Sequence, residues 1–81
     1  MREYRFHNTK HFIHRADERN LSVETIKHII AYPESKQRMG IGKHGDKWVF
    51  MKSIEGVTFK VVADIKNQDC WIVTAYPLDL P

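Results

Sequence analysis

The chain has 81 residues, of which 42% are hydrophobic and 28% are charged, and its net charge at pH 7 is +3. This length is that of a single domain with a small core, and the composition excludes a disordered chain. No apolar run reaches the roughly 18 residues of a membrane span. The mild positive charge favours an acidic partner, of which nucleic acid is the commonest.

Two helices are predicted in the first part of the chain, over about residues 9–32. Thr9 suits the N-cap of the first helix, which would run to about Arg19, and Ser22 suits the N-cap of the second. Pro33 ends the second helix, because the residue before a proline avoids the α region. Apolar residues at helical spacing give this helix one buried face: Val23, Ile26, Ile29 and Ile30.

From about residue 36 to residue 76 the apolar residues recur with a period of two, which predicts strands. The predicted strands cover residues 36–41, 48–54, 57–65 and 70–76. Glu55-Gly56 and Asn67-Gln68 are the predicted tight turns. The sequence therefore predicts one α+β domain over residues 1–81, with two N-terminal helices packed on a three- to four-stranded antiparallel sheet.

The two turns predict a register for this sheet. The first turn places Lys52 opposite Phe59, and the second places Tyr76 opposite Phe59 and Thr74 opposite Val61. Lys52, Thr74 and Tyr76 then lie at one end of the more apolar face, against which we expect the helices to pack. The same register forms two favourable opposite-charge pairs, Lys47 with Asp64 and Lys66 with Asp69.

His11, Arg15 and Arg19 are spaced four residues apart and form a stripe along the first predicted helix. The stripe borders the apolar arc of that helix, so we expect it to face the polar end of the sheet and to form a cationic cleft with it. Arginine binds phosphate through paired hydrogen bonds, and histidine exchanges a proton near neutral pH. The alternative is that both arginines are surface residues that pack their stems and that His11 is structural.

Metal sites have less support. His7, His11 and His14 have a spacing that could present two or three imidazoles on one helix side, but zinc usually takes further ligands, and Cys70 is the single cysteine. A magnesium-dependent nuclease needs clustered carboxylates. The carboxylates are scattered over predicted turns and strands, at Asp46, Glu55, Asp64 and Asp69. We therefore expect no metal and no cofactor.

The single cysteine and the N-terminal residues bear on the compartment. Cys70 cannot form a disulfide within the chain and suits a reduced compartment, where it acts as a small hydrophobe. The N-terminal residues carry charges and no apolar run of signal-peptide length. We therefore expect a cytoplasmic protein that does not associate with membranes.

The run from Lys10 to Ser22 resembles the opening of a small bacterial family of unknown function. Its members have the approximate pattern His-x3-Arg-x3-Arg-Gly-hydrophobic-Ser/Thr, then an amphipathic helix, and they end in a Val-Thr-x-Tyr-like strand. Asn20 stands where the family usually has glycine, a conservative change because Asn tolerates the left-handed region. The matching residues span most of the chain: His11, Arg15, Arg19, Leu21, Ser22, Ile26, Ile30, Pro33, Thr74 and Tyr76.

That family resembles the barnase/EndoU/colicin/RelE-like superfamily of small metal-independent ribonucleases, many of which are toxins. The resemblance implies helices followed by a four-stranded antiparallel sheet. It also implies RNA cleavage by attack of the ribose 2′-OH on the adjacent phosphate, and a cognate antitoxin or immunity protein as partner. The alternative is a non-catalytic module that binds nucleic acid or a protein on the same fold, because fold alone does not specify function.

The ribonuclease hypothesis gives each candidate residue a role. His11 is the general base or acid, and Arg15 holds the scissile phosphate and stabilises its charge. Tyr76 and Thr74 donate a hydrogen bond to the phosphate or transfer the second proton. Two further cations bind flanking phosphates, Arg19 and Lys52.

Overall fold

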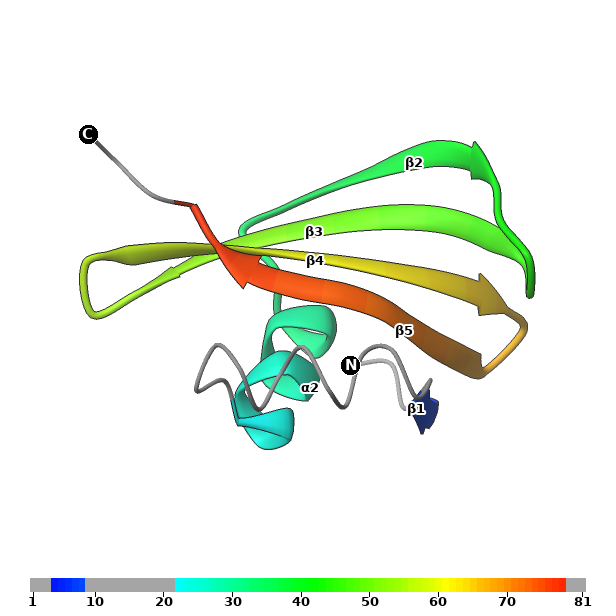
Figure 1. Ribbon diagram of the computed structural model, residues 1–81, viewed down its shortest axis with the longest axis horizontal. Coiled ribbons are helices and arrows are strands. Elements are labelled where there is room, and N and C mark those ends of the chain that lie inside the picture. The colour runs from blue at the N-terminus through cyan, green and yellow to red at the C-terminus, as the bar shows by residue number, and fades with distance from the viewer. Residues whose placement is uncertain (1–3, 9–21, 79–81) are drawn as a thin grey trace.

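The computed structural model describes residues 4–8 and 22–78. Within these residues one helix packs against one five-stranded sheet (Figure 1). The elements are β1 (Arg5–Asn8), α2 (Val23–Ala31), β2 (Ser35–Ile41), β3 (Asp46–Ile54), β4 (Val57–Lys66) and β5 (Asp69–Pro77). The strand order is β1-β5-β4-β3-β2, with β1 parallel to β5 and the other neighbours antiparallel.

The α+β class agrees with the prediction, but the sheet is larger than expected and mixed rather than purely antiparallel. The additional strand is β1, which lies beside β5 with Arg5 opposite Asp69 and His7 opposite Trp71. A strand of four residues is too short for its alternation to be distinguished from a loop in the sequence. The predicted first helix, from Thr9 to about Arg19, lies outside the described residues.

The helix α2 begins where its sequence signal predicts. The Ser22 hydroxyl accepts hydrogen bonds from the main-chain N–H groups of Glu24 and Thr25, which the first helical turn leaves without internal partners. At the other end the Lys52 amino group donates to the carbonyl of Tyr32 at 2.7 Å. A cation at this end is favourable because the helix dipole is negative there. No helix in the described residues is long and apolar enough to cross a membrane.

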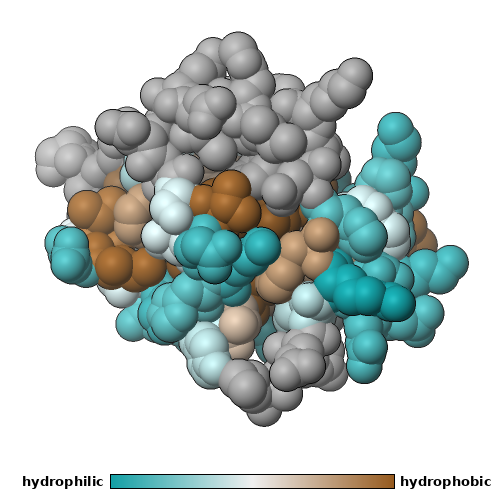
Figure 2. Space-filling view, turned by 90° about the horizontal axis from the view of Figure 1, so that it is seen from below, coloured by the Kyte–Doolittle hydropathy of each residue, from teal (hydrophilic) through white to brown (hydrophobic). Residues whose placement is uncertain are grey.

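The core lies between α2 and the sheet. Ile26, Ile29 and Ile30 are at most 2% exposed and contribute the apolar face of the helix. The sheet contributes Phe50, Val61, Ala63, Cys70, Ile72 and Ala75. Figure 2 views the molecule from the side that carries α2, where hydrophobic groups show between hydrophilic ones. The side chains that alternate with these core residues along the strands lie on the opposite face of the sheet.

The hairpin of β3 and β4 has the predicted register. Lys52 lies opposite Phe59 and Lys47 lies opposite Asp64. The turn residue Glu55 has a φ of 51° and Gly56 a φ of 82°. Two consecutive positive φ values are typical of the two-residue hairpin turns whose twist matches that of the strands.

The pairing of β5 with β4 changes register partway along. Lys66 lies opposite Asp69 as predicted, and Ala63 lies opposite Ile72. The next pair along β4 is Val62 with Thr74, so Val73 is an extra residue in β5 and forms a β-bulge. A bulge has no reliable sequence signal here, because Val73 suits a regular strand equally well.

The bulge makes the predicted pairing of the last part of β5 wrong by one residue. Because side chains alternate along a strand, the extra residue turns Thr74 and Tyr76 away from α2 and brings Ala75, which is 2% exposed, into the core. The observed partners are Val62 for Thr74 and Lys60 for Tyr76, where Val61 and Phe59 were expected.

Candidate functional site

The described residues do not form the predicted cleft. Lys52 lies on the face that carries α2, where its amino group binds a main-chain carbonyl at the helix end. Thr74 and Tyr76 lie on the other face because of the bulge. Lys52 is therefore separated from them by the sheet. The remaining predicted residues, His11, Arg15 and Arg19, lie outside the described part of the chain, and their roles stay predictions.

We call the side of the sheet turned away from α2 the outer face. The register and the alternation of side chains place a series of titratable residues on it. They are Arg5, His7, Lys47, Lys60, Asp64, Lys66 and Asp69. This face therefore combines proton-exchanging, cationic and anionic groups, and its geometry defines the candidate site.

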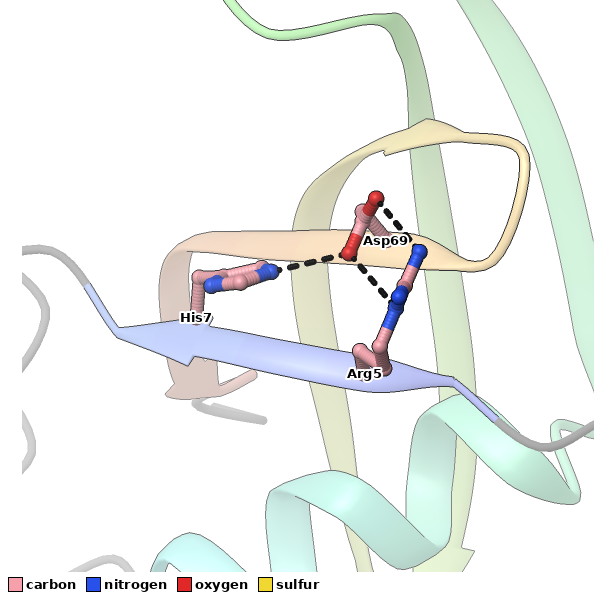
Figure 3. A network of polar contacts seen from close by, with 3 residues as sticks. All are labelled: Arg5, His7 and Asp69. Atoms are coloured by element: carbon pink, nitrogen blue, oxygen red, sulfur yellow. Dashed lines mark hydrogen bonds and ion pairs between the residues drawn. The ribbon is translucent and has the colours of Figure 1, made fainter.

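Asp69 connects β5 to β1 through two side chains (Figure 3). The Nε2 atom of His7 lies 3.0 Å from Oδ1 of Asp69. The guanidinium of Arg5 donates to Oδ2 at 3.1 Å, and its Nε lies 3.0 Å from Oδ1. The side chain of His7 is 45% exposed and that of Arg5 is 70% exposed, so both can be reached from solvent. The parallel register of β1 produces this arrangement, because it places Arg5 directly opposite Asp69.

The same contacts set the ionisation of Asp69. The hydrogen bond with His7 is the largest influence and lowers the pKa of Asp69 below 3.8, and the charges of Arg5 and His7 lower it further, against a smaller opposing effect of burial. Asp69 is therefore a carboxylate at neutral pH. A neutral imidazole that donates to it through Nε2 keeps a lone pair on Nδ1. Nδ1 is then the atom of His7 that can accept a proton.

Trp71 carries an imidazole on each side. The rings of His7 and Trp71 are stacked with centroids 5.0 Å apart and planes 20° apart. The rings of His44 and Trp71 are stacked at 4.9 Å and 15°. His7 reaches the indole from β1, whereas His44 reaches it from the side of β4, where the His44 main-chain N–H donates to Asp64. The indole therefore lies between the two imidazoles.

Asp64 fixes the loop that carries His44. Asp64 is 2% exposed, and its Oδ2 accepts the main-chain N–H of His44 at 3.2 Å. Gly42 packs so closely on this carboxylate that a Cβ at position 42 would overlap it. The loop is closed by a hydrogen bond from the Gly42 N–H to the Gly45 carbonyl at 2.7 Å. The carboxylate therefore holds the loop over the outer face and positions the His44 ring.

Three lysines surround these groups on the outer face. Lys47 is paired with Asp64 in the sheet, Lys66 lies at the end of β4, and the Lys60 amino group lies 6.0 Å from the ring centroid of Tyr76. Histidine transfers protons, aromatic rings stack on bases, and lysines neutralise phosphates. The outer face thus combines histidine, aromatic and lysine side chains.

The arrangement of metal-ligating side chains can be compared with the zinc and magnesium alternatives for residues 4–8 and 22–78. No group of three or more His, Cys, Asp or Glu side chains within these residues is arranged to hold a metal ion. Of the three histidines considered as zinc ligands, His7 is described and hydrogen-bonds to Asp69. The other two, His11 and His14, lie outside the described residues.

The sequence did not single out His7, Asp69, Trp71 and His44 as one site. The histidine spacing makes His7 a candidate zinc ligand, and the predicted register pairs Asp69 with Lys66. Residues His7 and Asp69 are 62 positions apart and meet because β1 pairs with β5 in parallel. The one available signal is the alternation of polar and apolar residues from Arg5 to His7, which is the alternation of an edge strand.

The fold and the site define a small α+β domain whose sheet presents a polar, histidine-bearing face. Residues 8–77 match the family described as Domain of unknown function (DUF4258), and the chain belongs to that family. This confirms the predicted membership of a family of unknown function, and the match shows no link to ribonuclease toxins. No curated protein and no solved structure matches the chain significantly.

Proposed function

We propose that the protein is a metal-independent ribonuclease of toxin type and that His7 is a proton-transfer group of its site. One observation carries this proposal. The exposed imidazole of His7 is hydrogen-bonded to Asp69, and Arg5 holds the same carboxylate. RNA cleavage without a metal requires a base that takes the proton of the 2′-OH as this oxygen attacks the adjacent phosphate.

Each member of this group of three has a physical role. Asp69 fixes the orientation of the His7 ring and stabilises the imidazolium that forms when Nδ1 accepts a proton. Arg5 is exposed enough to turn part of its guanidinium toward a phosphate, whose developing negative charge it would stabilise. Base and phosphate ligand thus come from the same strand, two residues apart.

The reaction also needs an acid that gives a proton to the leaving 5′ oxygen. His44 does not suit this role beside His7, because the Trp71 ring lies between the two imidazoles, 5.0 Å from one and 4.9 Å from the other. We assign the acid to His11, with Arg15 as a second phosphate ligand, as the sequence pattern predicts. Both assignments rest on the sequence alone.

The test is cleavage of single-stranded RNA of mixed sequence by the purified protein in EDTA. We expect products with 2′,3′-cyclic phosphate ends, which attack by the 2′-OH produces. His7→Asn should lower the rate by about 100-fold or more, which is the usual contribution of a general base. Asp69→Asn should lower it less, because the imidazole remains. His28→Asn is the matched control, since His28 is an exposed histidine on α2.

Two results would contradict the proposal. The first is the absence of cleavage by the unaltered protein. The second is equal cleavage by His7→Asn and His28→Asn at equal thermal stability. Equal cleavage by His11→Ala and Arg15→Ala would instead remove only the assignment of the acid and the second phosphate ligand.

A second function, RNA binding without cleavage, is favoured by the stack of His7, Trp71 and His44. Stacked rings beside lysines are typical of surfaces that bind single strands without reaction. This function predicts salt-sensitive binding with no turnover. In either case a toxin would act with an inhibitory protein partner, as the family resemblance implies.

A further inference from the structure

The strand β2 has a free side within the described part of the chain. In the strand order it has β3 as its one neighbour. All of its residues are exposed except Gly40, which is half-buried. An edge strand directs every second main-chain N–H and C=O group away from its sheet, and these groups can pair with another extended chain.

This edge carries two exposed apolar side chains. Ile41 is 82% exposed and Met39 is 54% exposed, the two highest values for large hydrophobic residues in the described part of the chain. Single exposed hydrophobic residues are common on protein surfaces. Two of them at one end of a free edge strand are less common, because the unpaired main-chain groups of such a strand bind other extended chains unless the strand is covered.

The edge is also basic. Lys36 and Arg38 lie on β2, and no acidic residue lies between Ser35 and Ile41. The Lys36 amino group lies 5.5 Å from the ring centroid of Trp48, and Arg38 donates to Asp46 at 3.0 Å. These contacts hold both cations beside the strand. An acidic chain would therefore meet the Lys36 ammonium in a fixed position, whereas Arg38 already shares its charge with Asp46.

A hollow adjoins the end of this edge. It has a volume of about 560 Å³ and lies between the β2–β3 loop and the β4–β5 turn. Its lining includes Ile41, Lys43 and Lys66. An extended chain that continues past Ile41 would enter this hollow, where two more ammonium groups would meet its acidic side chains.

We propose that β2 is the docking edge for an extended acidic segment of a partner protein, which adds as a sixth strand and covers Met39 and Ile41. Main-chain hydrogen bonds would supply affinity, and the apolar and basic positions would supply specificity. A second copy of the chain fits this edge less well, because edge-to-edge pairing would bring Lys36 and Arg38 of one copy beside those of the other. RNA would use the charges but would leave Met39 and Ile41 uncovered.

The probe is a synthetic peptide of eight residues that alternates glutamate with valine. We expect it to bind and to protect main-chain N–H groups of β2 from hydrogen exchange. A peptide with lysine in place of glutamate, and a peptide methylated on alternate main-chain nitrogens, should bind at least about tenfold more weakly. The first control removes the charge match and the second removes the strand hydrogen bonds.

Variants of the protein localise the contact. Ile41→Ser and Lys36→Gln should each weaken peptide binding by about five- to tenfold, within the usual range for one interface side chain. The matched controls are Val57→Ser and Lys27→Gln, which alter one exposed apolar residue and one lysine away from β2 and should leave affinity unchanged. RNA cleavage by Ile41→Ser should equal that of the unaltered protein, so this test is independent of the proposed ribonuclease activity.

Four outcomes would overturn the proposal. One is failure of the peptide to protect β2, and another is equal binding of the methylated peptide. Concentration-dependent dimerisation that Ile41→Ser abolishes would assign the edge to a second copy. Protection of β2 by a short single-stranded RNA, with loss on Lys36→Gln but not on Ile41→Ser, would assign it to nucleic acid.

Discussion

Asp69 accepts hydrogen bonds from two side chains of β1, and these contacts determine when it takes up a proton. Because the pKa of Asp69 is lowered from 3.8, mainly by the hydrogen bond with His7, the carboxylate stabilises the folded state at pH above 3.8. That stabilisation is lost as the pH falls through the lower pKa of the folded protein. The link between β1 and β5 should therefore weaken in acid.

The first prediction concerns this carboxyl group. His7→Ala should raise the pKa of Asp69 toward 3.8, because the largest cause of its depression is removed. Carbon-detected NMR titration of the carboxyl group measures the shift. His44→Ala is the control, since His44 contacts Trp71 and not Asp69. An unchanged titration in His7→Ala would show that Arg5 alone sets the ionisation of this carboxylate.

The second prediction concerns the buried thiol of Cys70. Burial, with a smaller effect of the Asp64 charge, raises the pKa of Cys70 from 9.0 to about 12. The unfolded chain therefore loses this proton at lower pH than the folded protein. The contribution of the thiol to stability is complete below pH 9.0 and is lost as the pH rises toward about 12, with a limiting slope of about 1.4 kcal/mol per pH unit.

Chemical denaturation at a series of pH values above 9 measures this effect as a difference between the unaltered protein and Cys70→Ala, because the two proteins share every other ionisable group. We expect the stability of Cys70→Ala to fall less steeply with pH. The native thiol should also react with a disulfide reagent only as fast as the core opens. Rapid labelling under native conditions would contradict the buried position of Cys70.

At the scale of elements, the signals that succeeded are local. The Ser22 cap, the turn at Glu55-Gly56 and the register of β3 with β4 each depend on residues close together in the chain. Helix caps and two-residue turns have specific residue requirements, and a tight turn then fixes the pairs that follow it. For this reason the central hairpin and the start of α2 could be predicted from the sequence.

The features that the sequence did not predict have no local signal. The pairing of β1 with β5 joins segments about sixty residues apart, with Arg5 opposite Asp69, and no local pattern encodes which edge a short strand will join. The bulge at Val73 also has no sequence signal, yet it moves Thr74 and Tyr76 to the opposite face of the sheet. One extra residue thus separated the predicted site residues, because the predicted site assumed unbroken alternation along β5.

The third prediction separates a structural from a nucleic-acid-binding role for Lys52. Its amino group bonds to the Tyr32 carbonyl at the end of α2, so Lys52→Met should lower the stability of the fold by about 1 kcal/mol. RNA affinity should not change, since Lys52 is on the face that carries α2. Lys60→Met on the outer face should instead weaken RNA binding and leave the stability of the fold unchanged. Denaturation and RNA titration of both variants measure them, and weaker RNA binding by Lys52→Met would restore its predicted role.

At the scale of the whole molecule, the net charge of +3 is a small excess of 13 basic over 10 acidic residues, so its distribution matters more than its size. On the outer face Asp69 is engaged by Arg5 and His7, and Asp64 is buried. The outer-face lysines therefore meet little competing negative charge at the surface. A polyanion should bind to this face in preference to the side that carries α2.

The last prediction tests that preference through the dependence of RNA binding on salt. Each phosphate that a lysine neutralises on a single strand contributes about 0.7 to the slope of log affinity against log salt concentration. Lys47→Gln combined with Lys66→Gln should therefore reduce the slope by about 1.4, because both lysines lie on the outer face. Lys27→Gln combined with Lys36→Gln changes the net charge equally, away from that face, and should leave the slope unaltered. Equal slopes for the two double variants would show that RNA binding depends on net charge alone. The outer face would then not be the RNA-binding surface.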